Sequence, residues 1–371
     1  MIRSKILLAA ALTALTTTQS SGADAAESSP SFLPPYVLEE IAKHGNAARR
    51  AQAQRQLLQD RAFLPGGEGQ LDAERRAPLL SRGIYTANNS QFLPGVLVWR
   101  GPPAPLPADK RVKEAAAGQA ATINFFKFAI NRTLPVPGTV HFGSQYNNAF
   151  WNGTQMVFGD GDGFLFNPFT CCIEIVGHER QHGVTGNRLA YHKQSGALNE
   201  SLSDVFGVLT VQYLKGQSAA QADWLVGKGL LARGIKGRAL RDMAKPGTAY
   251  NDPFLGKDPQ PAHMSAFRNL PDDVNHDWGG VHYNSGIPNR AFVLFAKAVG
   301  GNAYDIPGHV WSAALNSSYP ANVGFAAFAQ ITVDRAKQLY GSAIAAKLVQ
   351  AWTTVGLTTR VPAATFEVAA E

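Results

Sequence analysis

The chain has 371 residues, of which 45% are hydrophobic and 16% charged, so it can bury large cores, and we expect two domains after processing. Its net charge of +7 gives little support for nucleic-acid binding, because the densest basic stretch, residues 228–245, contains no aromatic side chain. We therefore expect no nucleic-acid partner, and we interpret that stretch as a solvated loop with one functional arginine, Arg241.

Residues 1–26 have the features of a signal peptide. Arg3 and Lys5 form a basic start, residues 6–15 are apolar, and Ala23 to Ala25 offer small residues for cleavage. The apolar stretch is too short to span a bilayer, and no other segment is typical of a transmembrane helix. The sequence therefore predicts secretion, to the periplasm or the medium for a bacterial protein, with no membrane partner.

Residues 27–82 are expected to form a propeptide. They are rich in Ala, Arg and Gln, they show helical spacing over 36–58, and a glycine-rich stretch follows at 66–69. We expect cleavage somewhere before Ile84. The propeptide would then be a partner of its own chain, as an intramolecular inhibitor or chaperone.

Residues 83–190 are predicted to form the N-terminal half of the catalytic unit. Runs of β-branched and aromatic residues separated by Gly and Pro indicate mostly β structure, with one helix over 112–130. Residues 169–184 lead into a second helix that Gly186 should end. Cys171 and Cys172 are adjacent, so a disulfide between them would be strained. We expect two small buried thiols there, with a soft-metal site as the alternative.

This second helix carries the motif His178-Glu179-Arg180-Gln181-His182. Residues four apart share one helix face, so His178 and His182 can bind one ion while Glu179 reaches a metal-bound water. The bare motif also arises by chance in chains of this size, and two ordinary helix histidines are then the alternative.

A downstream segment, residues 199–204, favours zinc over chance. Glu200 can be the third ligand, and two His with one Glu and an open fourth position form a known catalytic zinc site. Asp204, one turn later, can accept an N–H bond from a zinc-bound His, and Asn199 is placed with it as a supporting residue. We expect one catalytic Zn²⁺.

The remaining chain, residues 191–361, is predicted to be a helical C-terminal half, followed by a tail at 362–371. Apolar periodicity marks helices over 287–299, 325–340 and 344–355. No internal repeat is present. The whole pattern indicates an α+β fold with a mostly β N-terminal half, a central zinc-binding helix and an α-helical C-terminal half.

Four blocks in this order resemble the thermolysin family of secreted zinc metallopeptidases: residues 145–163, the two zinc segments, and residues 277–286. The resemblance covers about 82–357. Pro34-Pro35-Tyr36 before a short helical segment is similar to the compact propeptide of the protealysin subgroup. The family implies a thermolysin-like two-domain enzyme that hydrolyses peptide bonds without a covalent intermediate.

The resemblance also implies roles for the matching residues. Glu179 would be the general base, Tyr191 and His282 would donate hydrogen bonds to the oxyanion, and Asp277 would orient His282. Peptide substrates would bind in extended form through Asn148, Ala149 and Arg241. The pocket after the scissile bond would be entirely apolar, which predicts cleavage on the N-terminal side of Leu, Phe, Ile or Val. Its walls would be Phe166, Phe169, Ile175, Val226, Leu230 and Leu240, each of which has plain core packing as its alternative.

Two departures from the family pattern stand out. Arg180 and Gln181 replace an apolar and a small residue in the zinc helix, so Arg180 must find a carboxylate or reach solvent. For this reason a catalytically impaired scaffold, acting as a binding or regulatory protein, is kept as the alternative.

At the family's double calcium site Glu174 and Asp223 remain, but Val211 and Lys228 replace two acids. Calcium is therefore unlikely there, and we expect the ammonium of Lys228 to lie near Glu174 or Asp223.

Overall fold

The structure is a computed structural model that describes residues 30–62, 79–131 and 135–362. The predicted signal peptide, the glycine-rich stretch at 66–69 and nearly all of the predicted tail lie outside this range. Within it, no helix is both long and apolar enough to cross a membrane.

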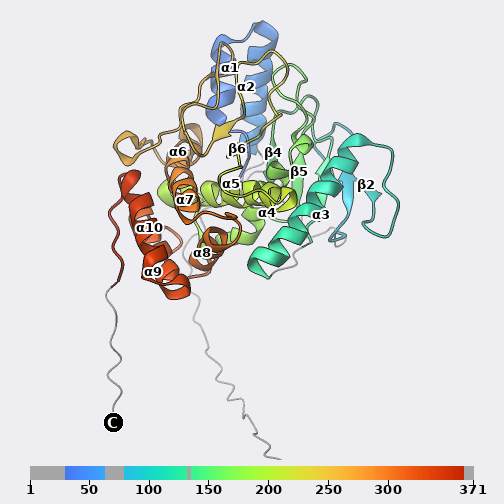
Figure 1. Ribbon diagram of the computed structural model, residues 1–371. Coiled ribbons are helices and arrows are strands. Elements are labelled where there is room, and N and C mark those ends of the chain that lie inside the picture. Colours follow the sequence, from blue (N-terminus) through green and yellow to red (C-terminus); the bar gives the residue numbers. More distant parts are fainter. Residues whose placement is uncertain (1–29, 63–78, 132–134, 363–371) are drawn as a thin grey trace, which may run out of the picture.

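Two helices of the predicted propeptide form a hairpin that stands on the rest of the molecule (blue in Figure 1). They are α1 (Pro35–His44) and α2 (Ala47–Ala62). The single helical segment expected over 36–58 is therefore divided. The break falls at Gly45, whose backbone is extended, and where an added Cβ would lie 2.7 Å from the Ile41 carbonyl oxygen.

The N-terminal half is built on one five-stranded mixed sheet in the order β2-β1-β3-β5-β4, so β4 lies at an edge. Helix α3 (Lys110–Ile130) begins at Asp109, whose carboxylate accepts bonds from two backbone N–H groups, and this confirms the helix predicted over 112–130. The strands are β1 (Ile84–Thr86), β2 (Val96–Trp99), β3 (Gly138–Val140), β4 (Ala149–Trp151) and β5 (Met156–Phe158).

Two helices at the centre of the molecule, α4 (Ile173–Thr185) and α5 (Lys193–Lys215), pack directly against each other (Figure 1). Glycines permit the close approach, because a Cβ on Gly177 would lie 2.9 Å from the Cα of Gly207. Gly186 follows α4 with a φ of +49°, as its sequence position predicted. This packing fixes where the two zinc segments meet.

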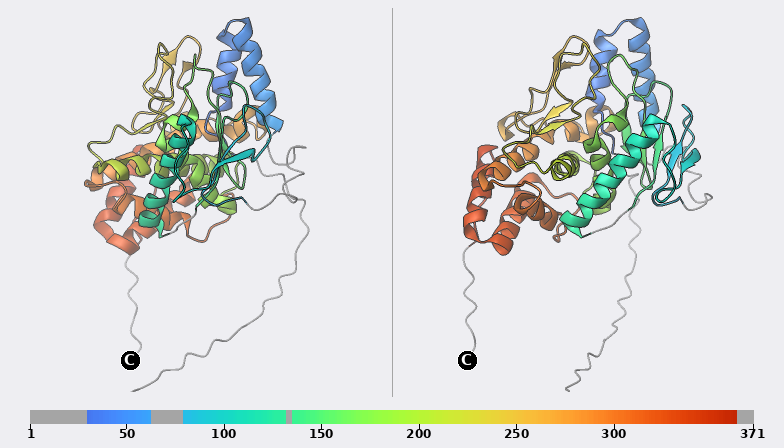
Figure 2. Two further views of the ribbon diagram at one scale, coloured as in Figure 1. Left: turned by 90° about the vertical axis from the view of Figure 1, so that its right-hand side faces the viewer. Right: turned by 45° about the vertical axis from the view of Figure 1, so that its right-hand side comes forward.

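The C-terminal half is helical, and Figure 2 shows its last helices grouped at the end of the molecule away from α1 and α2. The predicted helices over 287–299, 325–340 and 344–355 are confirmed within two residues at each end. Trp311 stacks between Phe295 and Trp352, with ring centroids 5.9 Å from each. The helices are α6 (Asp277–Asn284), α7 (Gly286–Val299), α8 (Ile306–Leu315), α9 (Phe325–Tyr340) and α10 (Ser342–Thr354).

Short elements complete the described fold. Two pairs of short antiparallel strands are present: β6 (Leu225–Val226) pairs with β7 (Arg241–Asp242), and β8 (Asn251–Asp252) pairs with β9 (Gly256–Lys257). Single 3₁₀ turns are η3 (Phe169–Cys171), η4 (Gly186–Arg188), η5 (Met264–Ala266) and η6 (Val274–His276). The α+β architecture predicted from the sequence is thus confirmed.

Candidate zinc centre and peptide-binding cleft

The three predicted zinc ligands meet where α4 crosses α5. His178, His182 and Glu200 are all buried, and their ligand atoms lie within 4.8 Å of one another. The two Nε2 atoms are 3.0 Å apart, and they lie 3.4 and 3.5 Å from the oxygens of Glu200. Two imidazole nitrogens and one carboxylate, converging in a buried space, form a donor set that fits Zn²⁺ with a fourth position left open.

Two residues of α5 fix the orientation of both imidazole rings by hydrogen bonds to Nδ1. His178 Nδ1 is 2.9 Å from Asp204 Oδ1, and His182 Nδ1 is 2.9 Å from Asn199 Oδ1. These bonds fix the tautomer that presents Nε2 to an ion. The hydroxyl of Ser203 also lies 3.1 Å from His182 Nδ1, a neighbour that the sequence motif did not reveal.

Asp204 is itself held by a buried network. Arg241 donates to both of its oxygens, at 2.8 and 2.7 Å, and the amide of Asn289 adds a bond of 2.9 Å. Burial opposes the charged form, but Arg241 and His178 together more than offset it, and the pKa of Asp204 is lowered to about 2. Sequence reasoning placed Arg241 on the substrate and missed both this ion pair and Asn289, because β7 and α7 are distant from α5 in sequence.

Glu179 points into the same buried space. Both of its carboxylate oxygens lack a hydrogen-bond partner among the described residues. Burial raises the pKa of Glu179 to about 8 in the absence of a cation, and a divalent ion beside it would favour the charged form. A buried, unpaired carboxylate next to three metal donors is well placed to accept a proton from a water molecule.

On the opposite side of the cleft, α6 presents His282. Asp277 accepts bonds from its Nδ1 at 2.6 Å and from its backbone N–H at 2.8 Å, so the ring is fixed with Nε2 facing the cleft. The backbone reaches this arrangement through Gly279 and Gly280, with φ values of +82° and +81° that favour glycine. The Tyr191 hydroxyl bonds to Glu200 and lies 3.4 Å from His282 Nε2.

The propeptide enters this cleft as an extended strand beside β4. Phe32 donates its N–H to Ala149 O at 2.9 Å, and Leu33 donates to Asn148 Oδ1 at 2.7 Å. Arg241 donates to Phe32 O at 3.0 Å. All three residues predicted to bind a substrate backbone therefore bind the predicted propeptide. The sequence predicted this segment as an intramolecular inhibitor or chaperone, but it did not predict these contacts.

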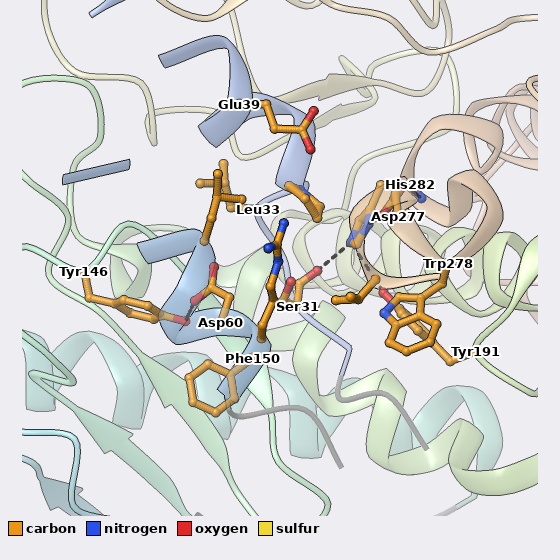
Figure 3. Close-up of a pocket in the computed structure, with 14 residues that line it drawn as sticks. Ser31, Leu33, Glu39, Asp60, Tyr146, Phe150, Tyr191, Asp277, Trp278 and His282 are labelled. Atoms are coloured by element: carbon orange, nitrogen blue, oxygen red, sulfur yellow. Dashed lines mark hydrogen bonds and ion pairs between the residues drawn. The ribbon is translucent and has the colours of Figure 1, made fainter. Parts of the chain in front are cut away.

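The six predicted pocket walls are all buried, at 0–1% exposure. The Phe32 side chain packs edge-on against Phe169, with ring centroids 6.3 Å apart, and against His178 at 5.1 Å. A pocket remains between the predicted propeptide and the rest of the chain, with Leu33, Glu39 and Asp60 among its lining residues on one side and Tyr146, Tyr191 and Trp278 on the other (Figure 3).

Arg180 meets neither of the two conditions expected from the sequence. Its side chain is fully buried in α4, and its nitrogens have no hydrogen-bond partner among the described residues. The guanidinium carbon lies over the face of Phe126, 5.4 Å from the ring centroid. Gln181 is buried too, and donates to Thr185 Oγ1 at 3.1 Å. The expectation of a carboxylate or solvent partner for Arg180 is therefore wrong.

Two further expectations concern the ammonium of Lys228 and the burial of the two cysteines. Lys228 Nζ lies 2.5 Å from Asp223 Oδ2, as expected, whereas Glu174 accepts the backbone N–H of Lys228, at 3.1 Å. Both cysteines are free thiols; Cys172 is buried, but Cys171 is exposed, because the η3 turn directs it outward. The expectation of two buried thiols is wrong for Cys171.

Comparisons with known proteins agree with this geometry. Residues 81–186 match the thermolysin metallopeptidase catalytic domain, and residues 187–357 match the α-helical domain of the same family. The chain belongs to the thermolysin family of metallopeptidases. As a thermolysin-family enzyme, it is 44% identical over 341 residues to an extracellular metalloprotease of Pectobacterium carotovorum subsp. carotovorum, covering 89% of this chain and 97% of that protein.

Two further comparisons show that this thermolysin-family chain is protealysin-like. Protease PrtS of Photorhabdus sp. (strain Az29) is 40% identical over 342 residues, covering 88% of this chain and 91% of that protein. The solved precursor of protealysin, a metalloproteinase from Serratia proteamaculans, superposes with a TM-score of 0.79 at 46% identity. That match covers 89% of this chain and all of the precursor chain. The chain is thus protealysin-like and a zymogen.

Proposed function

We propose that the protein is a secreted zinc endopeptidase that hydrolyses peptide bonds on the N-terminal side of bulky hydrophobic residues. One observation supports this most strongly. His282 Nε2 lies 2.7 Å from the main-chain carbonyl oxygen of Ser31 and 3.4 Å from Oε2 of Glu200, one of three metal donors in a buried space that also holds the unpaired carboxylate of Glu179. A base, a metal site and an oxyanion donor therefore converge on one peptide group.

Each residue of the proposed site has a separate chemical role. His178, His182 and Glu200 would hold a zinc ion, which would supply an activated water and polarise the carbonyl group of the bound peptide. Glu179 takes a proton from the water and passes it to the departing amine. His282, oriented by Asp277, stabilises the negative charge that develops on the carbonyl oxygen, with Tyr191 beside it as the second proposed donor.

Substrate selection rests on backbone and apolar contacts. The edge strand β4 and Arg241 hold an extended peptide through its main chain, which requires no particular sequence. The buried apolar walls around Phe169 favour a large hydrophobic residue directly after the cleaved bond, and the seating of Phe32 at this place supports that preference. Secretion is supported by the signal-like residues 1–26 and by the word extracellular in the name of the Pectobacterium relative.

The test compares the processed wild-type protein with Glu179→Gln. Because Glu179 is proposed as a base and not a ligand, the variant should retain one zinc per chain and lose peptide hydrolysis by at least about a hundredfold. Zinc is measured by elemental analysis, and cleavage is measured on casein and on peptides with Xaa–Phe or Xaa–Asp bonds. Loss of zinc from Glu179→Gln would show that the roles are wrongly assigned. A zinc-loaded wild-type protein without activity would favour the impaired binding scaffold.

A further inference from the structure

The propeptide pairs with β4 on both sides of a single peptide bond, the one between Ser31 and Phe32. Before this bond, Trp151 donates its N–H to Pro30 O at 3.3 Å. After it, Phe32 donates its own N–H to Ala149 O at 2.9 Å. Ser31 itself forms an antiparallel bridge with Phe150. The pairing is continuous across the bond, as expected for a bound substrate.

The carbonyl group of this bond occupies the reacting position. His282 Nε2, the proposed oxyanion donor, lies 2.7 Å from Ser31 O (Figure 3). The following carbonyl, that of Phe32, accepts a bond of 3.0 Å from Arg241. The Phe32 ring packs beside Phe169 and His178, where the residue after a cleaved bond is expected.

We propose that the bond between Ser31 and Phe32 is a substrate of the chain's own active site and is the first bond cut during maturation, within the same molecule. This inference rests on the proposed function. One water is consumed: its oxygen bonds to the Ser31 carbonyl carbon, the C–N bond to Phe32 breaks, and the proton taken by Glu179 passes to the Phe32 nitrogen. The products are a carboxylate at Ser31 and a new N-terminus at Phe32.

The same contacts indicate that this cut does not activate the enzyme. Phe32 is fully buried, and Tyr36, Val37 and Ile41 of α1 remain packed against the catalytic domain after the bond is broken. The new N-terminal residue therefore stays in the cleft as a bound product. Activity toward other substrates requires a second cut before β1 and loss of the whole hairpin. Trimming at Ser31 then precedes activity.

The experiment follows the purified full-chain precursor by intact mass and N-terminal sequencing. Wild type should acquire Phe32 as its N-terminus, at a rate independent of protein concentration, before casein cleavage begins; Glu179→Gln should remain intact. Phe32→Asp places a charge in the apolar pocket and should slow the cut by about a hundredfold. Phe32→Leu is the matched control and should leave the rate of the cut between residues 31 and 32 nearly unchanged.

A second readout does not depend on catalysis. In a Glu179→Gln precursor, hydrogen exchange should show the Phe32 and Leu33 amides protected, and adding Phe32→Asp should abolish that protection while leaving the core of α5 unchanged. Unprotected amides in Glu179→Gln overturn the inference.

Three outcomes of the cleavage assay would also overturn it. In the first, the wild-type precursor keeps the Ser31–Phe32 bond intact, although its mature form cleaves casein; the proposed function then stands. In the second, the cut is seen but its rate rises with protein concentration, so it occurs between molecules. In the third, neither the precursor nor casein is cleaved by zinc-loaded protein, so the proposed function fails as well.

Discussion

Arg180 introduces an unbalanced charge into the helix that carries the metal ligands. Burial lowers its pKa to about 10, so the guanidinium is still charged at neutral pH. A cation–π contact such as the one with Phe126 contributes about 2 kcal/mol at most. Removing the charge from water costs several kcal/mol. The contact therefore does not offset the cost, and Arg180 should destabilise α4.

Replacing Arg180 by Leu should therefore raise the free energy of unfolding, by about 1–4 kcal/mol. The change is best measured by urea unfolding of the Glu179→Gln protein, in which self-digestion is prevented. Arg233→Leu is the matched control, because Arg233 is exposed and its replacement should change stability by less than about 0.5 kcal/mol. A loss of stability in Arg180→Leu would indicate that the guanidinium has a bound partner that offsets its burial.

His282 should act mainly on the transition state. Its Nε2 faces a carbonyl oxygen, and this bond strengthens as negative charge develops there. His282→Ala should lower kcat about a hundredfold with little change in KM, measured with a peptide substrate of the mature enzyme. Asp277→Asn should reproduce part of the loss, because Asp277 only orients the ring. A rise in KM at unchanged kcat would contradict this role.

At the scale of elements, Lys228, for which the family resemblance implies an acid, lies next to the start of α4, and its ammonium pairs with Asp223 at the surface. The two side chains are 61% and 49% exposed, so the pair contributes about 0–1 kcal/mol. Glu174 is satisfied separately by a backbone N–H, which any residue at position 228 would supply. The ammonium of Lys228 therefore pairs with Asp223 and does not lie between Asp223 and Glu174.

Calcium should consequently have little effect on this region. With zinc held constant, adding calcium to about 1 mM should leave the melting temperature of the Glu179→Gln protein unchanged. Lys228→Ala should lower stability by at most about 1 kcal/mol. The control is Lys228→Glu, which restores an acid and should make the melting temperature respond to calcium. If calcium clearly raises the melting temperature of the protein with Lys228 intact, the Lys228 ammonium does not take the place of a calcium ion.

Helix α2 carries a carboxyl group whose charge opposes propeptide docking. Asp60 accepts a bond of 2.6 Å from the buried hydroxyl of Tyr146 (Figure 3). Burial raises the pKa of Asp60 to about 6, although bonds from Tyr146, Gln56 and Asn148 lower it. Glu39 and Arg61, two other charged residues of the propeptide side, line the same pocket.

The pKa of Asp60 predicts a pH dependence of docking. A free aspartate has a pKa of about 3.9, so the docked state binds the proton more tightly than the undocked state. Docking is therefore strongest below pH 4, weakens as the pH rises toward 6, and is constant above it. In Glu179→Gln, the protection of the α2 amides, relative to their intrinsic exchange rate at each pH, should fall over this range; adding Asp60→Asn should remove the fall. An equal pH response in both proteins would assign it to another group.

At the scale of the whole molecule, the metal ligands and the helical half could be predicted from the sequence, because their spacing is local. His178 and His182 are one turn apart, and Asn199, Glu200 and Asp204 lie on one helix. The position of Ser31 could not be predicted, because its bond to His282 joins residues 251 apart in sequence. The same holds for Arg241, whose bonds to Asp204 and Phe32 depend on how β7, α5 and the propeptide pack together.

Because the hairpin of α1 and α2 belongs to the same chain as the cleft that it fills, its local concentration there is set by covalent attachment and not by the amount of protein in solution. Dilution alone therefore leaves the intact precursor inactive. Once the chain is cut before β1, the hairpin becomes an ordinary ligand whose occupancy falls with concentration. Release into a large external volume would then favour its loss, so dilution and proteolysis act together to switch the enzyme on.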